Sequence, residues 1–457
     1  MTQIPSPTAN GNLRSGHIGL LQVVGQCFSI GPLMDVALFL GIVASMAGAV
    51  GPLAVLLAAL GMLFFSMVVA FYASETGGAG AMGDYIERAW GRRAGVGALG
   101  IYVISLVISG AGGFTIAFGD LARRFSHHYF HLDFPWWWAA VALCYGAWWL
   151  NGRGAKWATS VQLMIISVSV IPFLLTAAAV IGRAGARNTW SVFSWNNPHG
   201  GDLFGALLFS ILLFGGFETA AALAEETSNP RRNIPLALVG TVAAAAVLLV
   251  FCSYAGTIYF GPTHVAQSWG DALDGYAQMG GAVLGPWAAL WIRLAVLVDF
   301  SATCIGFSLA AARGLFSLAR AHHLPAIFAR TNRWGVPQQA ANAVFAAALL
   351  IIAAGLLVPA NEIYKTLFVV STAQALLLVL VYMGLALGAL RLLWRKRHSQ
   401  PAWRWVVFPL AAVGPCLALY GTFFPFPGYP ERYGLFGAFA ALVVVGLRLG
   451  GLRRRRG

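Results

Sequence analysis

The sequence predicts an all-α integral membrane protein with twelve transmembrane helices. Of its 457 residues, 59% are hydrophobic and only 10% are charged, whereas a soluble domain normally carries about 25% charged residues. The mean hydropathy is +0.74. Apolar segments of about 20 residues, the length that crosses a bilayer, recur along the whole chain. These observations exclude an ordinary soluble domain and make the lipid bilayer the first expected partner.

The expected spans follow one another with mostly short polar connections. Tryptophan clusters mark both ends of the fourth span, as aromatic side chains favour membrane interfaces. The spans are expected at residues 18–47, 53–73, 96–118, 136–149, 157–181, a sixth from about 203, then 236–259, 282–316, 343–357, 363–390, 406–423 and 435–447.

Basic residues are distributed unequally between the two sides of this topology. Of the 29 lysine and arginine residues, 22 fall on the side that carries both termini and 5 on the opposite side. This bias predicts cytoplasmic termini in a plasma (inner) membrane protein. The net charge of +14 is explained by these loops, so no nucleic-acid partner is expected. The five cysteines lie in apolar runs, which predicts free thiols rather than disulfides or metal ligands.

The segment FGGFETAAALAEETSNPRRNIP, from Phe214 to Pro235, interrupts the sixth apolar run. Gly215 and Gly216 predict an opening of the helix, since glycine gives up helical structure most readily. Glu218 follows at a depth where hydrocarbon is expected. Open backbone at that depth is tolerated only where it is buried in protein or lines a cavity, and an ionisable residue there indicates a functional site.

The first span has an interruption of its own, Gly31-Pro32. Proline lacks a donor and clashes with the preceding turn, so the helix is expected to break there. Interrupted spans 1 and 6 predict two five-helix repeats of opposite topology, residues 18–181 and 203–390, as in transporters with a binding site between the repeats. Ordinary kinks or packing contacts explain either break alone better than they explain the pair.

These segments resemble the amino acid–polyamine–organocation superfamily of permeases. The 214–235 stretch is similar to the family's signature in span 6, and segments 73–95, 151–162 and 312–339 are similar to other parts of its pattern. The resemblance covers roughly spans 1 to 10. It implies the LeuT-type fold of five plus five helices, with helices 1 and 6 broken and the substrate held between spans 1, 3, 6, 8 and 10.

The resemblance also divides the chain into four parts. Residues 1–17 are expected to form a cytoplasmic tail and residues 18–390 a ten-helix transporter core. Helices 11 and 12 fall within 391–447, and a basic cytoplasmic tail covers 448–457.

Two sets of residues map onto the unwound segments that bind substrate in this family, mainly through their backbone. The run in span 1 differs from the Gly-Ser/Thr-Gly-like run that is frequent there. The two sets are Ser29, Ile30, Gly31 and Pro32 in span 1, and Phe214, Gly215, Gly216 and Phe217 in span 6.

Acidic residues near the breaks are the candidates for substrate recognition and coupling. Glu218 resembles the acid that follows the span 6 break and would link gating to protonation, or cap the second half-helix. Asp35 would attract an amine, or would be an ordinary acid at a helix start. Asp299, with Ser301 and Thr303 in span 8, would serve coupling, because the matching part of span 8 supplies hydroxyls to a sodium site in this fold. Glu225 and Glu226 are expected to form a cytoplasmic gating cluster with Arg231 and Arg232.

The sequence therefore predicts a secondary active permease for an amino acid or an organic amine, working by alternating access. Coupling to a proton, coupling to sodium and exchange all stay open, although span 5 has no mid-membrane lysine for one known proton mechanism. No catalytic constellation, cofactor site or metal ligand set is recognisable, so an enzyme is not expected. The competing interpretations are a channel and a transporter fold kept as a sensor without flux.

Overall fold

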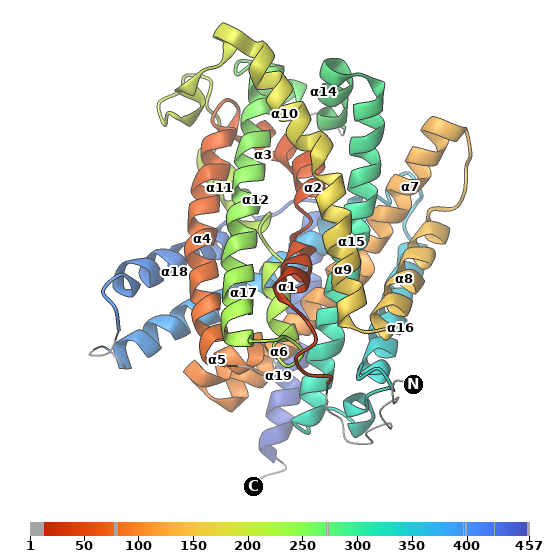
Figure 1. Ribbon diagram of the computed structural model, residues 1–457, viewed down its shortest axis with the longest axis vertical. Coiled ribbons are helices and arrows are strands. Elements are labelled where there is room, and N and C mark those ends of the chain that lie inside the picture. The colour runs from red at the N-terminus through yellow and green to blue at the C-terminus, as the bar shows by residue number, and fades with distance from the viewer. Residues whose placement is uncertain are drawn as a thin grey trace, which may run out of the picture.

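The computed structural model describes residues 13–76, 81–270, 272, 274–395, 397, 400–424 and 426–454. Within these residues the regular structure is helical, apart from two isolated bridges, Ile18–Thr227 and Gly48–Gly200. Ten helices are long and apolar enough to cross a membrane. The first described residues and the end of the last helix lie toward the same end of the bundle (Figure 1). The predicted all-α membrane architecture is confirmed.

The helices correspond to the predicted spans in order. Spans 1, 3, 5 and 6 are each built from more than one helical piece. The α-helices are α1 (Leu20–Cys27), α2 (Pro32–Met34), α3 (Leu40–Ala47), α4 (Gly51–Glu75), α5 (Met82–Trp90), α6 (Arg92–Leu106), α7 (Phe114–Phe130), α8 (Trp136–Gly152), α9 (Ala155–Ser169), α10 (Ile171–Ala184), α11 (Leu203–Leu212), α12 (Pro230–Phe260), α13 (Val265–Ser268), α14 (Gly275–Leu284), α15 (Pro286–Arg320), α16 (Gln338–Gly355), α17 (Lys365–Arg395), α18 (Arg404–Phe423) and α19 (Glu431–Arg454).

Two predicted boundaries differ because proline begins a helix there. Span 8 starts at Pro286 rather than at residue 282, since Gly285, at φ 106°, separates α14 from α15. Span 7 starts at Pro230 rather than at residue 236, so Arg231 and Arg232 lie in the first turn of α12. Proline suits the first helical position, where its missing N–H is not needed. The predicted fourth and twelfth spans are α8, of 17 residues, and α19.

The predicted tails are only partly described. Residues 1–12 and 455–457 lie outside the described part of the chain, as do residues 77–80 of the family-like segment 73–95. Residues 13–17 pack against the bundle, and α19 continues through Arg454. Most of the residues expected in a C-terminal tail are therefore helical.

Helix α15 lies at the centre of the bundle and positions the site. It packs against α6, α7, α8, α9, α14 and α16, and also against the pieces of spans 1 and 6. Twenty-one of its residues are buried, including the charged Asp299 and Arg313. Any polar group that α15 points toward the broken helices is therefore shielded from water and lipid.

Candidate functional site

The break in span 1 is built on one glycine. Helix α1 ends at Cys27, and a 3₁₀ turn, Phe28–Ile30, leads to Gly31, whose φ of 75° lies in the left-handed region. A Cβ on Gly31 would lie 2.9 Å from the hydroxyl oxygen of Thr303. Glycine is therefore required here both for the backbone turn and for the close approach of α15.

The break in span 6 lies directly against the break in span 1. Helix α11 ends at Leu212, and Gly216, with φ 115°, precedes a 3₁₀ segment, η6 (Phe217–Leu223). A Cβ on Gly216 would lie 2.8 Å from the carbonyl oxygen of Ser29. The hydroxyl of Thr219 donates to the carbonyl of Gln26 at 3.2 Å. The two irregular segments thus contact each other through their backbones.

Gly216→Ala is expected to impair any activity that depends on this arrangement. An alanine at φ 115° is strained and would also press on Ser29. Such strain costs about 1–3 kcal/mol. This corresponds to a roughly 5- to 150-fold lower population of the conformation that needs this backbone turn. Substrate uptake per inserted protein and thermal unfolding in detergent would measure the effect. Gly240→Ala, on an open face of α12 with no neighbour within 4 Å, is the matched control and is expected to change neither; equal behaviour of the two variants would contradict the prediction.

Glu218 is fully buried, and both of its oxygens are hydrogen bonded. Its Oε2 accepts the backbone N–H of Gly216 at 2.9 Å and the hydroxyl of Tyr382 at 2.6 Å. Its Oε1 accepts the hydroxyl of Tyr102 at 3.3 Å. The carboxyl group therefore binds the opened backbone of span 6 just before η6 and also connects this break to α6 and α17, while both of its predicted roles stay predictions.

The start of α2 is capped by Asp299. The Oδ2 of Asp299 accepts the backbone N–H groups of Leu33 and Met34, both at 2.9 Å, and so caps the start of α2 from a helix far away in sequence. Asp35 is buried in the π-helical turn that follows α2. Its Oδ2 has no hydrogen-bond partner among the described residues. Both roles considered for Asp35, attraction of an amine and an ordinary acid at a helix start, stay predictions.

Several buried oxygen atoms near the span 1 break have no hydrogen-bond partner in the described part of the chain, and three of them belong to acids or a hydroxyl singled out by the sequence. These three are Oδ2 of Asp35, Oδ1 of Asp299 and Oγ1 of Thr303. Asp299 and Thr303 are four residues apart and so share a face of α15. Ser301 does not share it: its side chain is half-buried and donates to the carbonyl of Leu297 at 3.1 Å within the same helix. Unpaired buried acceptors are costly unless something donates to them.

Two buried glutamines, which were not predicted as site residues, connect spans 1, 5 and 8. Gln26 Nε2 donates to the carbonyl of Gly306 at 2.9 Å. Gln162 Nε2, from α9, donates to Ala302 O at 2.8 Å and to Ser29 Oγ at 3.3 Å. The Oε1 atoms of both glutamines are unpaired within the described residues. An amide side chain in an apolar run was the signal that could have identified them.

Ion pairs cross the bundle at both ends of this site. At the end near the termini, Glu226 contacts Arg313 at 2.5 Å, and Glu225 pairs with Arg320. The cluster of these acids with Arg231 and Arg232 stays a prediction, and the ion pairs seen here join the acids to Arg313 and Arg320 of α15. The predicted arginines, Arg231 and Arg232, are exposed on the first turn of α12.

At the opposite end, Arg293 contacts Asp274 at 2.6 Å and donates to the hydroxyl of Tyr129, also at 2.6 Å. It does not pair with Asp299, in agreement with their unsuitable spacing on the helix. Arg293 therefore joins α15 to α7 and to the start of α14. Each end of the region around the two breaks is bridged by at least one charged pair.

A cavity of about 670 Å³ lies elsewhere, along α4, α12 and the segment 188–193. Its lining is almost entirely apolar and includes Leu60, Val247 and Trp190, all exposed on the protein surface. It contains none of the polar groups around the breaks. The chemistry of a small polar ligand therefore fits the breaks and not this surface cavity.

Two transporters have similar sequences. The chain is 26% identical over 356 residues to an uncharacterized transporter of Legionella pneumophila, covering 74% of each chain. It is 23% identical over 349 residues to the putrescine transporter PotE of Escherichia coli, covering 75% of this chain and 76% of that one.

The fold has a counterpart among solved structures. The structure of the Eremococcus coleocola manganese transporter matches with a TM-score of 0.59 at 12% identity, covering 97% of this chain and 98% of that one. This likeness confirms the predicted fold class and concerns the fold alone. The sequence model of the amino acid permease family matches residues 21–447, nearly the whole chain. The protein therefore belongs to the amino acid permease family, within the amino acid–polyamine–organocation superfamily.

Proposed function

We propose that this permease is a secondary active transporter whose substrate carries a protonated amino group. The observation that carries the proposal is the set of unpaired oxygens on Asp35, Asp299 and Thr303 beside the span 1 break. A primary ammonium group has three donors and no acceptor, so it suits a region where buried oxygen atoms lack donors. Diamines and basic amino acids offer such a group, and the similar E. coli protein is a putrescine transporter.

The backbone of the two breaks would hold the rest of the substrate. Carbonyls of unwound backbone attract cations, whereas half-helix N-termini attract carboxylates. At α2 the N–H groups of Leu33 and Met34 are already taken by Asp299. This occupancy favours a substrate without a carboxylate at that position, because such a carboxylate would compete with Asp299 for the same donors. Ser29, Ile30, Gly31 and Pro32, with Phe214, Gly215, Gly216 and Phe217, remain the proposed lining.

Transport would proceed by alternating access, with the two charged bridges opening in turn. Separation of Glu226 from Arg313 would open the side with the termini, which the excess of basic residues predicts to be cytoplasmic. Separation of Arg293 from Asp274 would open the opposite side. Glu218 would link these movements, since one carboxyl group connects the span 6 break with α6 and α17. Coupling to a proton, coupling to sodium and exchange remain three possible modes of transport, and uptake under separate proton and sodium gradients distinguishes them.

Uptake into proteoliposomes of radiolabelled neutral amino acids, basic amino acids, diamines and small alkanolamines tests the proposal, with proton and sodium gradients imposed separately. Saturable uptake of an amine that has no carboxylate is the expected result. Uptake confined to neutral α-amino acids would overturn the amine assignment. If folded and inserted protein transports none of the compounds, a sensor is favoured. If the flux does not saturate with concentration, a channel is favoured.

A further inference from the structure

The apolar surface cavity along α4 and α12, called the lateral groove below, lies in the half of the bundle away from the first described residues. It is lined by residues 56–63 in the first half of α4 and by residues 246–254 in the second half of α12. Residues 188–193 complete it and belong to the connection between α10 and α11. This connection lies at the far end of the bundle (Figure 1), where a bridge between Gly48 and Gly200 holds it beside the start of α4.

The lateral groove has the depth of one leaflet of the expected bilayer. Its wall on α12, residues 246–254, is about 12 Å long and its wall on α4, residues 56–63, about 10 Å at the rise of an α-helix. The hydrocarbon core of a bilayer is about 30 Å thick, so one leaflet accounts for about 15 Å. Leu60 is 45% exposed and Val247 is 70% exposed, so the groove opens sideways, toward lipid. Its position and length therefore suit an acyl chain.

Aromatic side chains mark the end of the groove at the membrane surface. The rings of Trp190, Phe193 and Tyr254 contact one another, with centroids between 5.8 and 6.3 Å apart. Trp190 is 83% exposed, and the hydroxyl of Tyr254 donates to Oδ1 of Asn188 at 3.3 Å. Tryptophan and tyrosine favour the level of the lipid headgroups. The headgroup of a lipid in the groove would therefore lie beside residues 188–193.

An exposed cation lies next to this rim. Arg187 directly precedes Asn188 and makes no ion pair with any described residue. The connection 182–201 contains two arginines and no acidic residue, on a side where only 5 of the 29 basic residues are expected. The second arginine, Arg183, donates to the carbonyl of Val283. Because the topology rule disfavours cations on this side, a free guanidinium beside an apolar groove indicates an anionic ligand with a long apolar part.

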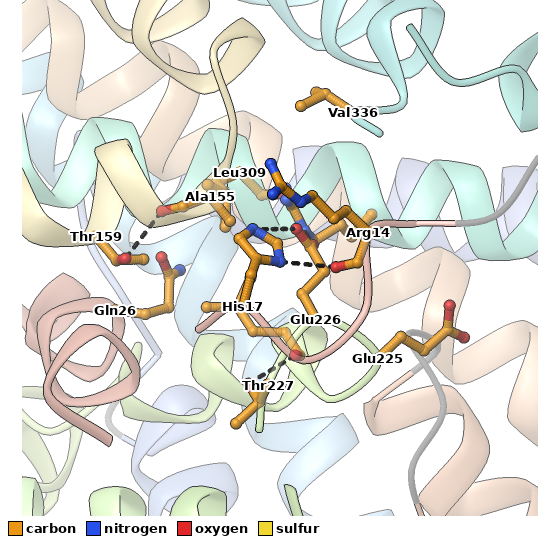
Figure 2. Close-up of polar contacts among 12 residues, drawn as sticks. Arg14, His17, Gln26, Ala155, Thr159, Glu225, Glu226, Thr227, Leu309 and Val336 are labelled. Atoms are coloured by element: carbon orange, nitrogen blue, oxygen red, sulfur yellow. Dashed lines mark hydrogen bonds and ion pairs between the residues drawn. The ribbon is translucent and has the colours of Figure 1, made fainter. Parts of the chain in front are cut away.

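The other end of the bundle has a different surface chemistry. Figure 2 shows Arg14, His17 and Glu226 close together there, and Glu226 also pairs with Arg313. Cations and acids are thus intermixed at that end, whereas the connection 182–201 carries cations alone. Charge complementarity to an anionic headgroup therefore belongs to the end with the lateral groove.

We propose that the lateral groove binds an anionic phospholipid, with an acyl chain along α4 and α12 and the phosphate at Arg187. The groove has a volume of about 670 Å³, within the range of about 300–1,000 Å³ that holds ligands. A phosphate without a chain would leave the apolar lining unused, and a zwitterionic lipid would bring its own cation to Arg187. Helix α12 also packs against α1 and η6, so the lipid lies one helix away from the two breaks. This site adds to the proposed transport function and does not depend on the identity of the substrate.

Photo-crosslinking of the full-length protein in phosphatidylcholine nanodiscs, without substrate, tests the site. The probe is a phosphatidylglycerol with a diazirine in the middle of one acyl chain, and the phosphatidylcholine with the same chain is the comparison. Labelling of residues 56–63 and 246–254 is expected by peptide mass spectrometry, about fivefold stronger for phosphatidylglycerol. Arg187→Gln is expected to remove this difference between the lipids. Arg93→Gln, at an exposed arginine in the first turn of α6, makes the same change in net charge and should preserve it.

A second variant tests the acyl chain. Ala246→Trp places a bulky side chain in the groove and is expected to lower its labelling at least about fivefold. Ala244→Trp, exposed on α12 outside the groove, is the matched control and should label like the wild type.

The proposal is overturned if both lipids label the groove equally, if the label lies elsewhere, or if Ala246→Trp labels like the wild type. Crosslinks that join two copies of the chain through the groove, in place of lipid, would overturn it in favour of self-association. The comparison of the two lipids in wild type and Arg187→Gln decides the question even if Ala246→Trp does not fold. Because no substrate is present, none of these results alters the transport proposal.

Discussion

Glu218→Gln is expected to cut substrate uptake by about tenfold or more while the protein still folds and inserts. Three donors, from Tyr382, Gly216 and Tyr102, converge on the two carboxylate oxygens. An amide has only one accepting oxygen, so at least one of these donors loses its partner. Hydrogen bonds to a charged group contribute about 1.5–3 kcal/mol each, and every 1.4 kcal/mol corresponds to about a factor of ten. Initial uptake rates, normalised to inserted protein, would measure the loss.

Two variants separate the charge of Glu218 from its hydrogen bonds. Tyr382→Phe removes the shortest of the three contacts and keeps the acid, so an intermediate loss of uptake is expected. Glu225→Gln changes the half-buried acid that pairs with Arg320 and is expected to affect uptake much less. Full uptake by correctly inserted Glu218→Gln protein would remove Glu218 from the coupling scheme. Loss of expression in Glu218→Gln and Tyr382→Phe, with normal expression of Glu225→Gln, would instead assign Glu218 a purely structural role.

The helix breaks could be predicted from sequence because their causes are local. Gly31-Pro32 and Gly215-Gly216 disrupt a helix in any context, and their pairing in spans 1 and 6 indicated the type of fold. The observed φ angles of 75° at Gly31 and 115° at Gly216 show where the chain turns. Such positions depend on backbone preferences of single residues, and sequence alone carries that information.

The partners of the acids could not be predicted, since they come from distant parts of the chain. Asp299 caps α2 across a separation of more than 260 residues, and Tyr382 reaches Glu218 across 164. No periodicity indicates which helix face meets which neighbour once both faces are apolar. Arg313 shows the same limit: it was counted among the basic residues of the terminal side, yet it lies buried within α15.

The two breaks are stabilised in different ways, and this difference favours different proposed roles for the acids. In span 6 the capping acid, Glu218, is local and fully hydrogen bonded. In span 1 the cap comes from Asp299, which leaves Asp35 beside the break with an oxygen that has no donor among the described residues. A buried carboxyl group that is not needed for the fold is the one most available to a ligand.

Asp35→Asn is therefore expected to weaken amine binding strongly and to leave the stability of the free protein almost unchanged. Truncating one partner of a buried charge pair costs about 2–5 kcal/mol, which is roughly a 30-fold or greater loss of affinity. The KM for amine uptake and the thermal midpoint of the ligand-free protein in detergent would measure the two quantities separately.

Asp299→Asn should lower the stability of the free protein more than it weakens amine binding, because it removes a charged cap that holds two N–H groups of α2. Losing a capping side chain costs about 0.5–2 kcal/mol, so the thermal midpoint of the ligand-free protein should fall. Ser301→Ala, two positions away and bonded only within α15, is the matched control and should leave both quantities unchanged. If Asp35→Asn lowers the midpoint and leaves the KM intact, Asp35 supports the fold and the ammonium site must lie elsewhere. If Asp35→Asn raises only the KM and Asp299→Asn lowers only the midpoint, recognition and capping are divided between two carboxyl groups.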